Sequence, residues 1–131
     1  GLSQLKKINK FIKKRKKISL KYYREIRNIK KISLTKLTNN YKSSYHLCII
    51  HLQKQNQNLK EKMIKFMLKN SVMLQYHYIP IYKFKIFQDK YINKNAEIYY
   101  NSAISLPIYY SLSEKSQNLI IRLLKKFFKK D

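Results

Sequence analysis

The chain has 131 residues, enough for one domain or for part of a larger protein. Its 30 basic and 6 acidic side chains give a formal charge of +24, which would suit a nucleic acid or an anionic membrane as partner. However, Lys far outnumbers Arg. The residues Ile, Asn and Tyr are common, whereas Gly occurs only once. The common residues, Lys, Ile, Asn and Tyr, have A/T-rich codons, whereas Arg and Gly have G/C-rich ones. We therefore attribute the charge to composition drift, because a phosphate-binding surface would keep more Arg, whose planar fork binds phosphate bidentately.

The single cysteine, Cys48, lies in an apolar run and is predicted to be a buried thiol in a reducing compartment. No run approaches the length of a membrane span. The polar N-terminal stretch lacks the apolar core and cleavage site of a signal peptide. These features favour a cytoplasmic protein, and the first residue, Gly1, is what a piece of a longer protein would show.

Residues 2–28 are predicted to form one long helix. Apolar residues recur about every 3.5 positions, and lysines fill the positions between them. The apolar stripe comprises Leu2, Leu5, Ile8, Ile12, Ile18, Tyr22 and Ile26, widened by Phe11. We favour a solvated basic face over a helix that binds a membrane or RNA, because the charge is spread over the whole chain.

Residues 29–44 are polar and contain no predicted element. The near-continuous apolar run at residues 45–52, YHLCIIHL, predicts a buried strand. His46 and His51 in this run are five residues apart and would point to opposite faces of the strand. That spacing does not build a metal site, and we predict none; one histidine should be bonded locally and the other should face solvent.

A polar loop is predicted at residues 53–59, followed by a helix at residues 60–69. Met63 and Met67 in this helix are predicted to fill the core. A turn then leads to a second predicted strand at residues 74–77.

Residues 83–95 are predicted to be irregular with one short helical turn. Phe84, Phe87 and Tyr91 stand between lysines, a pattern that base stacking would also use. Their spacing of three and four favours core contacts from one helix face. A short helix is predicted at residues 95–101.

The C-terminal stretch begins with an extended segment at residues 104–108, in which three apolar residues alternate with Ser105 and Pro107. This alternation predicts a strand with one buried face. Ser111 and Glu114 have the spacing of a capping box, and Ser113 is a second possible N-cap. A helix with apolar residues at helical spacing and four lysines near its end should follow.

Four segments, in order, resemble the sugar aminotransferases of the DegT/DnrJ/EryC1/StrS family. GLSQLKKINKFIKKRKKISLKYYREI is similar to the family's "GLSQLKKLD.FI.KR..IA..Y" helix, and YHLCIIHL to its "S.yHLyviRL" strand. AEIYYNSAISLPIYYSL resembles the pattern "E..Y...ISLP.Y..L" near the end of the family's chains. YHYIPIY resembles "VHYIP.Y", which recurs in the transaminases that make aminated UDP-sugars on the pseudaminic acid pathway.

The chain departs from the family pattern at two positions. Tyr76 replaces a usual Val, and Ser71 replaces a Gly that usually turns the chain out of the preceding helix. The second departure matters for local geometry if the turn needs a positive φ, which Gly adopts freely.

The resemblance covers essentially all of the chain and implies the last third of such an enzyme. The implied fold class is α/β, the C-terminal small domain of a fold-type I PLP-dependent transferase. Residues 1–30 would be an interdomain helix. Residues 31–131 would form the small domain, a mostly antiparallel sheet with helices on one face. The large PLP-binding domain would be absent from this chain.

The resemblance also implies a cytoplasmic, homodimeric enzyme that uses pyridoxal 5'-phosphate to move an amino group from L-glutamate to a 4-keto-6-deoxy UDP-sugar. The family's cofactor lysine lies in a Gly-rich motif, "SFH..K....GEGG", which has no counterpart here. No catalytic or cofactor-binding residue is therefore assigned, and this chain alone is expected to be inactive.

Three residues are candidates for binding the nucleotide-sugar. His77 and Tyr78 correspond to a family motif at the mouth of the active site, and the resemblance implies that they contact the substrate. Tyr82 is a candidate of the same kind. From the residues alone, a histidine at a strand end before Pro80 could donate to a diphosphate or a sugar hydroxyl, or equally hydrogen-bond within its own loop.

Two other readings of the chain remain open. The charge, the Lys-rich first helix and the aromatics between lysines also suit a small basic RNA-binding or ribosomal protein of an A/T-rich genome, which would bind RNA with a steep salt dependence. The chain could also be a decayed gene, or a remnant that pairs with a separately encoded cofactor domain.

Overall fold

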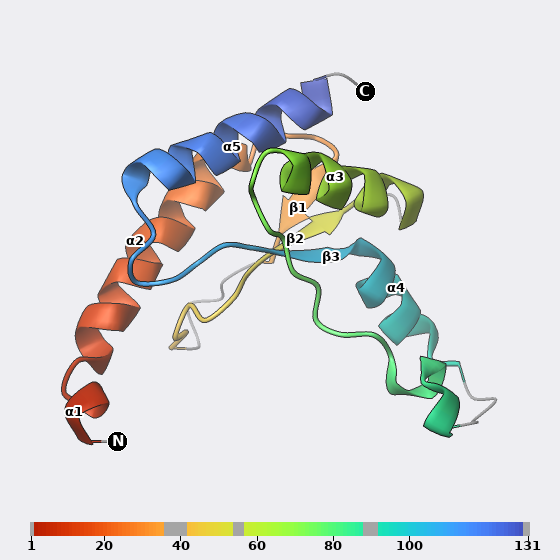
Figure 1. Cartoon of the computed structure of the whole chain (residues 1–131), viewed down its shortest axis with the longest axis horizontal. Coiled ribbons are helices and arrows are strands. Elements are labelled where there is room, and N and C mark those ends of the chain that lie inside the picture. Colours follow the sequence, from red (N-terminus) through yellow and green to blue (C-terminus); the bar gives the residue numbers. More distant parts are fainter. Residues whose placement is uncertain (1, 36–41, 54–56, 88–91, 130–131) are drawn as a thin grey trace.

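The computed structural model describes residues 2–35, 42–53, 57–87 and 92–129. Figure 1 shows an arch, with a small sheet at its centre and one arm on each side. One arm is the N-terminal helical region, and the other contains α4 (Lys94–Ser102) together with two short 3-10 turns.

The predicted N-terminal helix forms as two pieces, α1 (Leu2–Leu5) and α2 (Ile8–Ile26), separated by a turn. Only the C-terminal half of the apolar stripe is buried, at Ile18, Tyr22 and Ile26. The stripe in α1 is exposed, with Leu2 at 78% and Leu5 at 61%. None of the helices in the described residues is long and apolar enough to cross a membrane.

The sheet has the order β1-β2-β3, with β1 (Ile32–Leu34), β2 (Cys48–Leu52) and β3 (Ala103–Leu106) all antiparallel. Ile50 at its centre faces Leu34 on one side and Ile104 on the other. A small antiparallel sheet is therefore confirmed. The sequence missed β1, however, and β2 begins three residues later than expected.

The predicted strand at residues 74–77 is wrong. Only Gln75 pairs, in an isolated antiparallel bridge to Ser105 of β3. Both backbone bonds of this bridge are present, from Gln75 N–H to Ser105 O at 3.3 Å and from Ser105 N–H to Gln75 O at 2.7 Å. The neighbouring residues form no further ladder, because after the bridge the chain leaves β3 and continues toward the 3-10 turns (Figure 1).

Helices α2, α3 (Gln57–Lys69) and α5 (Glu114–Lys129) pack on one face of the sheet, as expected. Met63 and Met67 are fully buried there, which confirms their predicted role in the core. The other face is partly covered by α4, whose Tyr99 ring packs edge-on against His51 of β2 at 5.7 Å. This second cover explains why all four residues of β3 are buried, whereas one buried face was predicted.

The N-cap of α5 is Ser113, the second of the two predicted N-caps, and the predicted capping box of Ser111 and Glu114 does not form. The Ser113 hydroxyl accepts a hydrogen bond from the Ser116 N–H at 3.0 Å, the usual N-cap contact. Glu114 is the first residue of the helix and pairs with exposed Lys17 of α2 at 3.5 Å.

The segment before α4 contains two 3-10 turns, Ile81–Lys83 and Lys85–Phe87. Phe84 and Phe87 are each 48% exposed, so the prediction that they make core contacts is wrong. The turns are too short to present one apolar face to the core. Tyr91, the third aromatic of that pattern, lies outside the described residues.

Two long-range hydrogen bonds tie α2 to the C-terminal part of the chain. The hydroxyl of fully buried Tyr22 donates to the carbonyl of Pro107 at 3.0 Å, just after β3. The amide of buried Gln117 in α5 donates to the carbonyl of Ile18 at 2.8 Å. The buried half of α2 is thus held by polar as well as apolar contacts.

We predict that Tyr22→Phe lowers the free energy of unfolding by about 1–2 kcal/mol, because the Pro107 carbonyl loses the donor that the buried Tyr22 side chain supplies. Urea unfolding of the variant measures this change. Tyr23→Phe, which removes a hydroxyl from the next residue of the same helix, is the matched control and should have a smaller effect. Equal losses in the two variants would contradict the role given to the Tyr22 bond.

Ser71 ends α3 in the left-handed conformation, with φ 60°. The Ser71 N–H bonds to Leu68 O and the Val72 N–H bonds to Met67 O, both at 2.9 Å, which is the bonding of a Schellman motif. The turn thus needs the positive φ that the missing Gly would supply.

We predict that Ser71→Gly raises the free energy of unfolding by up to about 1 kcal/mol, since Gly has no Cβ to clash in this conformation. Thermal unfolding measures the gain. Ser71→Ala keeps the Cβ and is the control, with no gain expected. A variant with Gly that is less stable than the parent would show that the left-handed turn is not limiting.

Candidate functional site

A cavity of about 280 Å³ lies beside β3, where the segment after α3 meets the segments before β2 and after β3. We call it the His77 cavity. Its polar and aromatic lining residues include His46, Gln75, His77, Ser105 and Tyr109. Its volume lies just below the range of small-molecule pockets, so it suits one part of a ligand, such as a phosphate group or a sugar ring.

Within this cavity His77 is held from one side. Its Nδ1 lies 3.0 Å from the hydroxyl of Ser105 on β3, so its local partner belongs to the sheet and not to its own loop. Nε2 is the ring nitrogen that Ser105 does not contact. Tyr78 follows directly, 77% exposed, with its ring edge-on to His77 at 4.7 Å. His77 and Tyr78 are therefore adjacent, at a surface open to a ligand.

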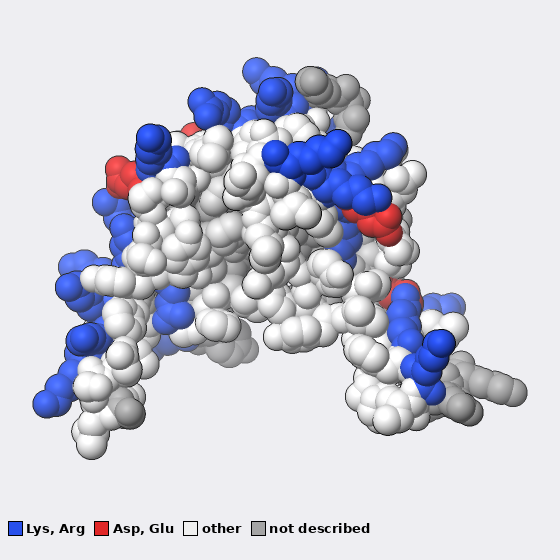
Figure 2. Space-filling view, in the orientation of Figure 1, with Lys and Arg blue, Asp and Glu red and all other residues white. Residues whose placement is uncertain are grey.

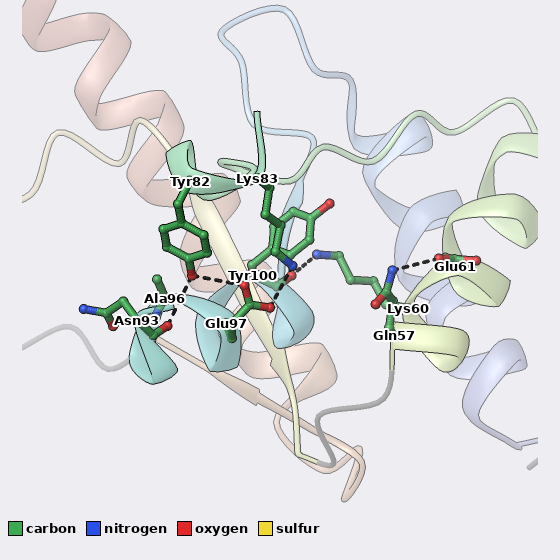
Figure 3. Close-up of polar contacts among 9 residues, drawn as sticks. All are labelled: Gln57, Lys60, Glu61, Tyr82, Lys83, Asn93, Ala96, Glu97 and Tyr100. Atoms are coloured by element: carbon green, nitrogen blue, oxygen red, sulfur yellow. Dashed lines mark hydrogen bonds and ion pairs between the residues drawn. The ribbon is translucent and has the colours of Figure 1, made fainter. Parts of the chain in front are cut away.

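Tyr82 lies apart from the His77 cavity. Its hydroxyl donates to Glu97 of α4 at 3.0 Å and lies 3.3 Å from the Asn93 carbonyl (Figure 3). Lys83 also bonds to Glu97, at 2.7 Å, and this hydrogen bond lowers the pKa of that carboxyl. Tyr82 thus fastens the 3-10 turn to α4 and does not join His77 and Tyr78 in one site.

Sequence reasoning missed a second group, which we call the Lys60 cluster: Lys60, Tyr76, Lys83, Glu97 and Tyr100. Figure 3 shows Lys60 reaching from α3 toward Tyr100 of α4, where its ammonium group donates to the Tyr100 carbonyl. The Lys60 nitrogen lies 4.5 Å from the Tyr100 ring centre and 5.0 Å from that of Tyr76. A carbonyl in the last turn of α4 and two ring faces favour the positive charge.

Lys60 is only 5% exposed, and no carboxylate pairs with it in the described residues. Burial lowers its pKa from 10.5 to about 8. The helical period could have revealed this position, because Lys60 is three residues before Met63 and seven before Met67, on the buried face of α3.

The remaining cysteine and histidine predictions concern the sheet. Cys48 is buried as predicted, and burial raises the pKa of its thiol to about 12, so it is unreactive at neutral pH. His51 lies 3.0 Å from the Thr35 hydroxyl, whereas His46 is exposed. Across residues 2–35, 42–53, 57–87 and 92–129, no three His, Cys, Asp or Glu residues gather as metal ligands.

The lining of the His77 cavity does not fit pyridoxal phosphate. The cofactor needs a lysine free to form an imine and an acidic partner for its ring nitrogen. Neither a lysine nor a carboxylate lines the His77 cavity. Lys60 is buried and bonded to the Tyr100 carbonyl, and the nearby Glu61 accepts from Gln57. No chemical step is therefore derived through this cofactor from the present chain.

The Lys60 cluster predicts a stability that depends on pH. Between pH 8 and 10.5 the unfolded chain holds the Lys60 proton that the folded chain has released, so the free energy of unfolding should rise with pH in this window. Measured relative to Lys60→Met, this gain should be visible from pH 7.5 to 9.5 by urea unfolding. Lys65→Met, which changes an exposed lysine of the same helix, should show the same rise in the free energy of unfolding with pH as the parent. An unchanged difference between parent and Lys60→Met across this range would contradict the buried charge.

Comparisons with known proteins identify relatives over nearly the whole chain. The sequence profile of the DegT/DnrJ/EryC1/StrS aminotransferase family matches residues 1–125. A UDP-4-amino-4,6-dideoxy-N-acetyl-beta-L-altrosamine transaminase of Helicobacter pylori is 32% identical, over 97% of this chain and 35% of its own length. The chain thus spans about a third of the curated relatives that it matches.

Solved structures agree with this match. PseC of Helicobacter pylori, an aminotransferase involved in the biosynthesis of pseudoaminic acid, superposes with a TM-score of 0.89 at 30% identity, covering 99% of this chain and 36% of PseC. The PLP-form of Spr1654 from Streptococcus pneumoniae, at 22% identity, shares the fold with a TM-score of 0.89, over 99% of this chain and 34% of its own. From the match over residues 1–125, the chain belongs to the DegT/DnrJ/EryC1/StrS aminotransferase family.

Proposed function

We propose that this chain is the C-terminal third of a PLP-dependent nucleotide-sugar aminotransferase, which transfers an amino group from L-glutamate to a 4-keto-6-deoxy UDP-sugar. Membership of the family supports the reaction class. The 32% identity to a transaminase named for a UDP-amino sugar supports the substrate class. The cofactor would be bound by the part of the enzyme outside this chain, which would also supply the Schiff-base lysine, and this chain alone would be inactive.

The His77 cavity is the observation that carries the proposal for this chain. His77 and Gln75 offer hydrogen-bond donors at one small hollow without a carboxylate in its lining, which suits the oxygens of a phosphate or a sugar. The exposed Tyr78 lies beside His77, outside the lining of the hollow. In this role His77 and Tyr78 contact the nucleotide-sugar directly. Tyr82 does not line the cavity, and its role would be indirect, through the bond to Glu97 that keeps the neighbouring turn in place.

Exposed apolar residues at both arms support the presence of further protein around this chain. In the N-terminal arm Leu2 and Leu5 are exposed, and in the other arm Ile81 and Ile86 are 61% and 84% exposed. Apolar patches of this kind usually meet other protein. In this proposal residues 1–30 connect the two domains, residues 31–131 form the small domain, and the enzyme is a cytoplasmic homodimer.

The RNA-binding alternative gains no support from the comparisons. Lysines and arginines are also scattered over the outer surfaces of several elements in Figure 2, while the space between the two arms is mostly uncharged in that view. A groove that follows a nucleic-acid backbone would instead gather its positive charge along one line.

The size of the native protein is a first test. An antibody raised against α5 should detect, in the source organism, a protein of about three times 16.0 kDa, because the chain spans 35% of its Helicobacter pylori relative. A native protein near 16.0 kDa would contradict a single-chain enzyme and would favour a partner that supplies the cofactor domain.

The substrate role of His77 is tested in the full-length enzyme. We predict that His77→Ala raises KM for the nucleotide-sugar about tenfold, which corresponds to about 1.4 kcal/mol of lost binding. Steady-state kinetics at saturating L-glutamate measures this. His51→Gln changes a half-buried histidine of β2 that does not line the His77 cavity, and it should leave KM unchanged. If His77→Ala also leaves it unchanged, His77 is not a substrate ligand.

A further inference from the structure

The position of Ser105 is fixed by its backbone on both sides. Within β3 it lies opposite Ile49 of β2. On its other side it forms the two-bond bridge with Gln75. Its backbone therefore has little freedom to move relative to the sheet, and the residue is only 5% exposed.

His77 is two residues beyond Gln75 along the same extended segment. In extended backbone, residues two apart point to the same side. The bridge at Gln75 thus brings the His77 ring to Ser105, where its Nδ1 meets the Ser105 hydroxyl at 3.0 Å. Both side chains line the His77 cavity. The pair is 28 residues apart in sequence and is formed only by the fold.

The direction of this hydrogen bond follows from what the hydroxyl can reach. A serine hydroxyl has one proton to donate, and a buried hydroxyl that donates to nothing carries an energetic cost. His77 Nδ1 is the partner that the structure gives to the Ser105 hydroxyl in the described residues. If Nδ1 carried the proton, the hydroxyl would have no acceptor among the described protein groups and could donate only to water in the cavity. The hydroxyl has a protein acceptor for its proton only when Ser105 donates and His77 Nδ1 accepts.

We propose that Ser105 is a positioning residue that keeps neutral His77 protonated on Nε2, so that the His77 cavity presents an N–H donor. Such a donor suits an anionic or hydroxyl oxygen of the substrate. A histidine with Nδ1 protonated would instead present a lone pair, which repels a phosphate oxygen. This role in the binding of nucleotide-sugar rests on the proposed function, whereas the protonation of His77 by itself does not.

The protonation of His77 is read directly by NMR. Long-range proton–nitrogen correlation spectra of the ¹⁵N-histidine-labelled chain at pH 8.5 distinguish the two ring nitrogens, and His77 is assigned from the signals lost in His77→Gln. We expect Nε2 to carry the proton in the parent. In Ser105→Ala, the fraction with the proton on Nδ1 should rise at least twofold.

Two further variants separate this role from a general loss of structure. Ser105→Thr keeps the hydroxyl and should restore the parent spectrum of His77, and Ser105→Cys is the smaller substitute if threonine does not fit the buried site. Backbone amide signals of β2 and β3 report whether each variant is folded. Nδ1 protonated in the parent, or identical His77 spectra in the folded parent and Ser105→Ala, would overturn the inference.

Kinetics of the full-length enzyme connect the pair to binding. Ser105→Ala should raise KM for the nucleotide-sugar several-fold, with a smaller effect on kcat, and Ser105→Thr should recover it. If His77→Ala raises KM while Ser105→Ala does not, Ser105 does not position His77 for binding. If His77→Ala has no effect either, the substrate site proposed above fails, while the NMR spectra still decide how His77 is protonated.

Discussion

The short stretch from Ser105 to Pro107 is the part of the chain on which the remaining structure depends. Its backbone pairs with β2, and the bridge at Ser105 holds the segment that carries His77. Two residues later the Pro107 carbonyl accepts from Tyr22 and so fixes α2. The candidate site and the long helix are thus joined through three consecutive residues, and a displacement of β3 would disturb both.

The elements with a strong period could be predicted from the sequence, and those set by a partner could not. Two patterns could be recognised from the local sequence alone: the apolar run that contains β2, and the apolar stripe of α5. β1 has only three residues, and its pairing depends on residues 48–52, so nothing local reveals it. Residues 74–77 show the opposite case, because a strand was predicted where the fold provides a partner for Gln75 alone.

The candidate site shows the same division. The resemblance to the family drew attention to His77, which lines a cavity, and to Tyr78, whose ring packs against His77. It also drew attention to Tyr82, whose hydroxyl is instead bonded to Glu97 in a different group. Ser105 could not be found from sequence, since its contact with His77 exists only after β3 and the segment following α3 have met.

The high lysine content also becomes intelligible once burial is known. Among the described lysines only Lys60 is buried, and it is the one that reaches a helix-terminal carbonyl between two tyrosine rings. The other described lysines keep contact with water, where a change to lysine costs little. A chain that acquires lysine through drift in composition should show this distribution, because the fold excludes lysine from the core unless a site such as that of Lys60 compensates its charge. The described basic side chains behind the charge of +24 thus lie at the surface, apart from Lys60, whereas the hollow beside β3 is lined by neither a lysine nor a carboxylate.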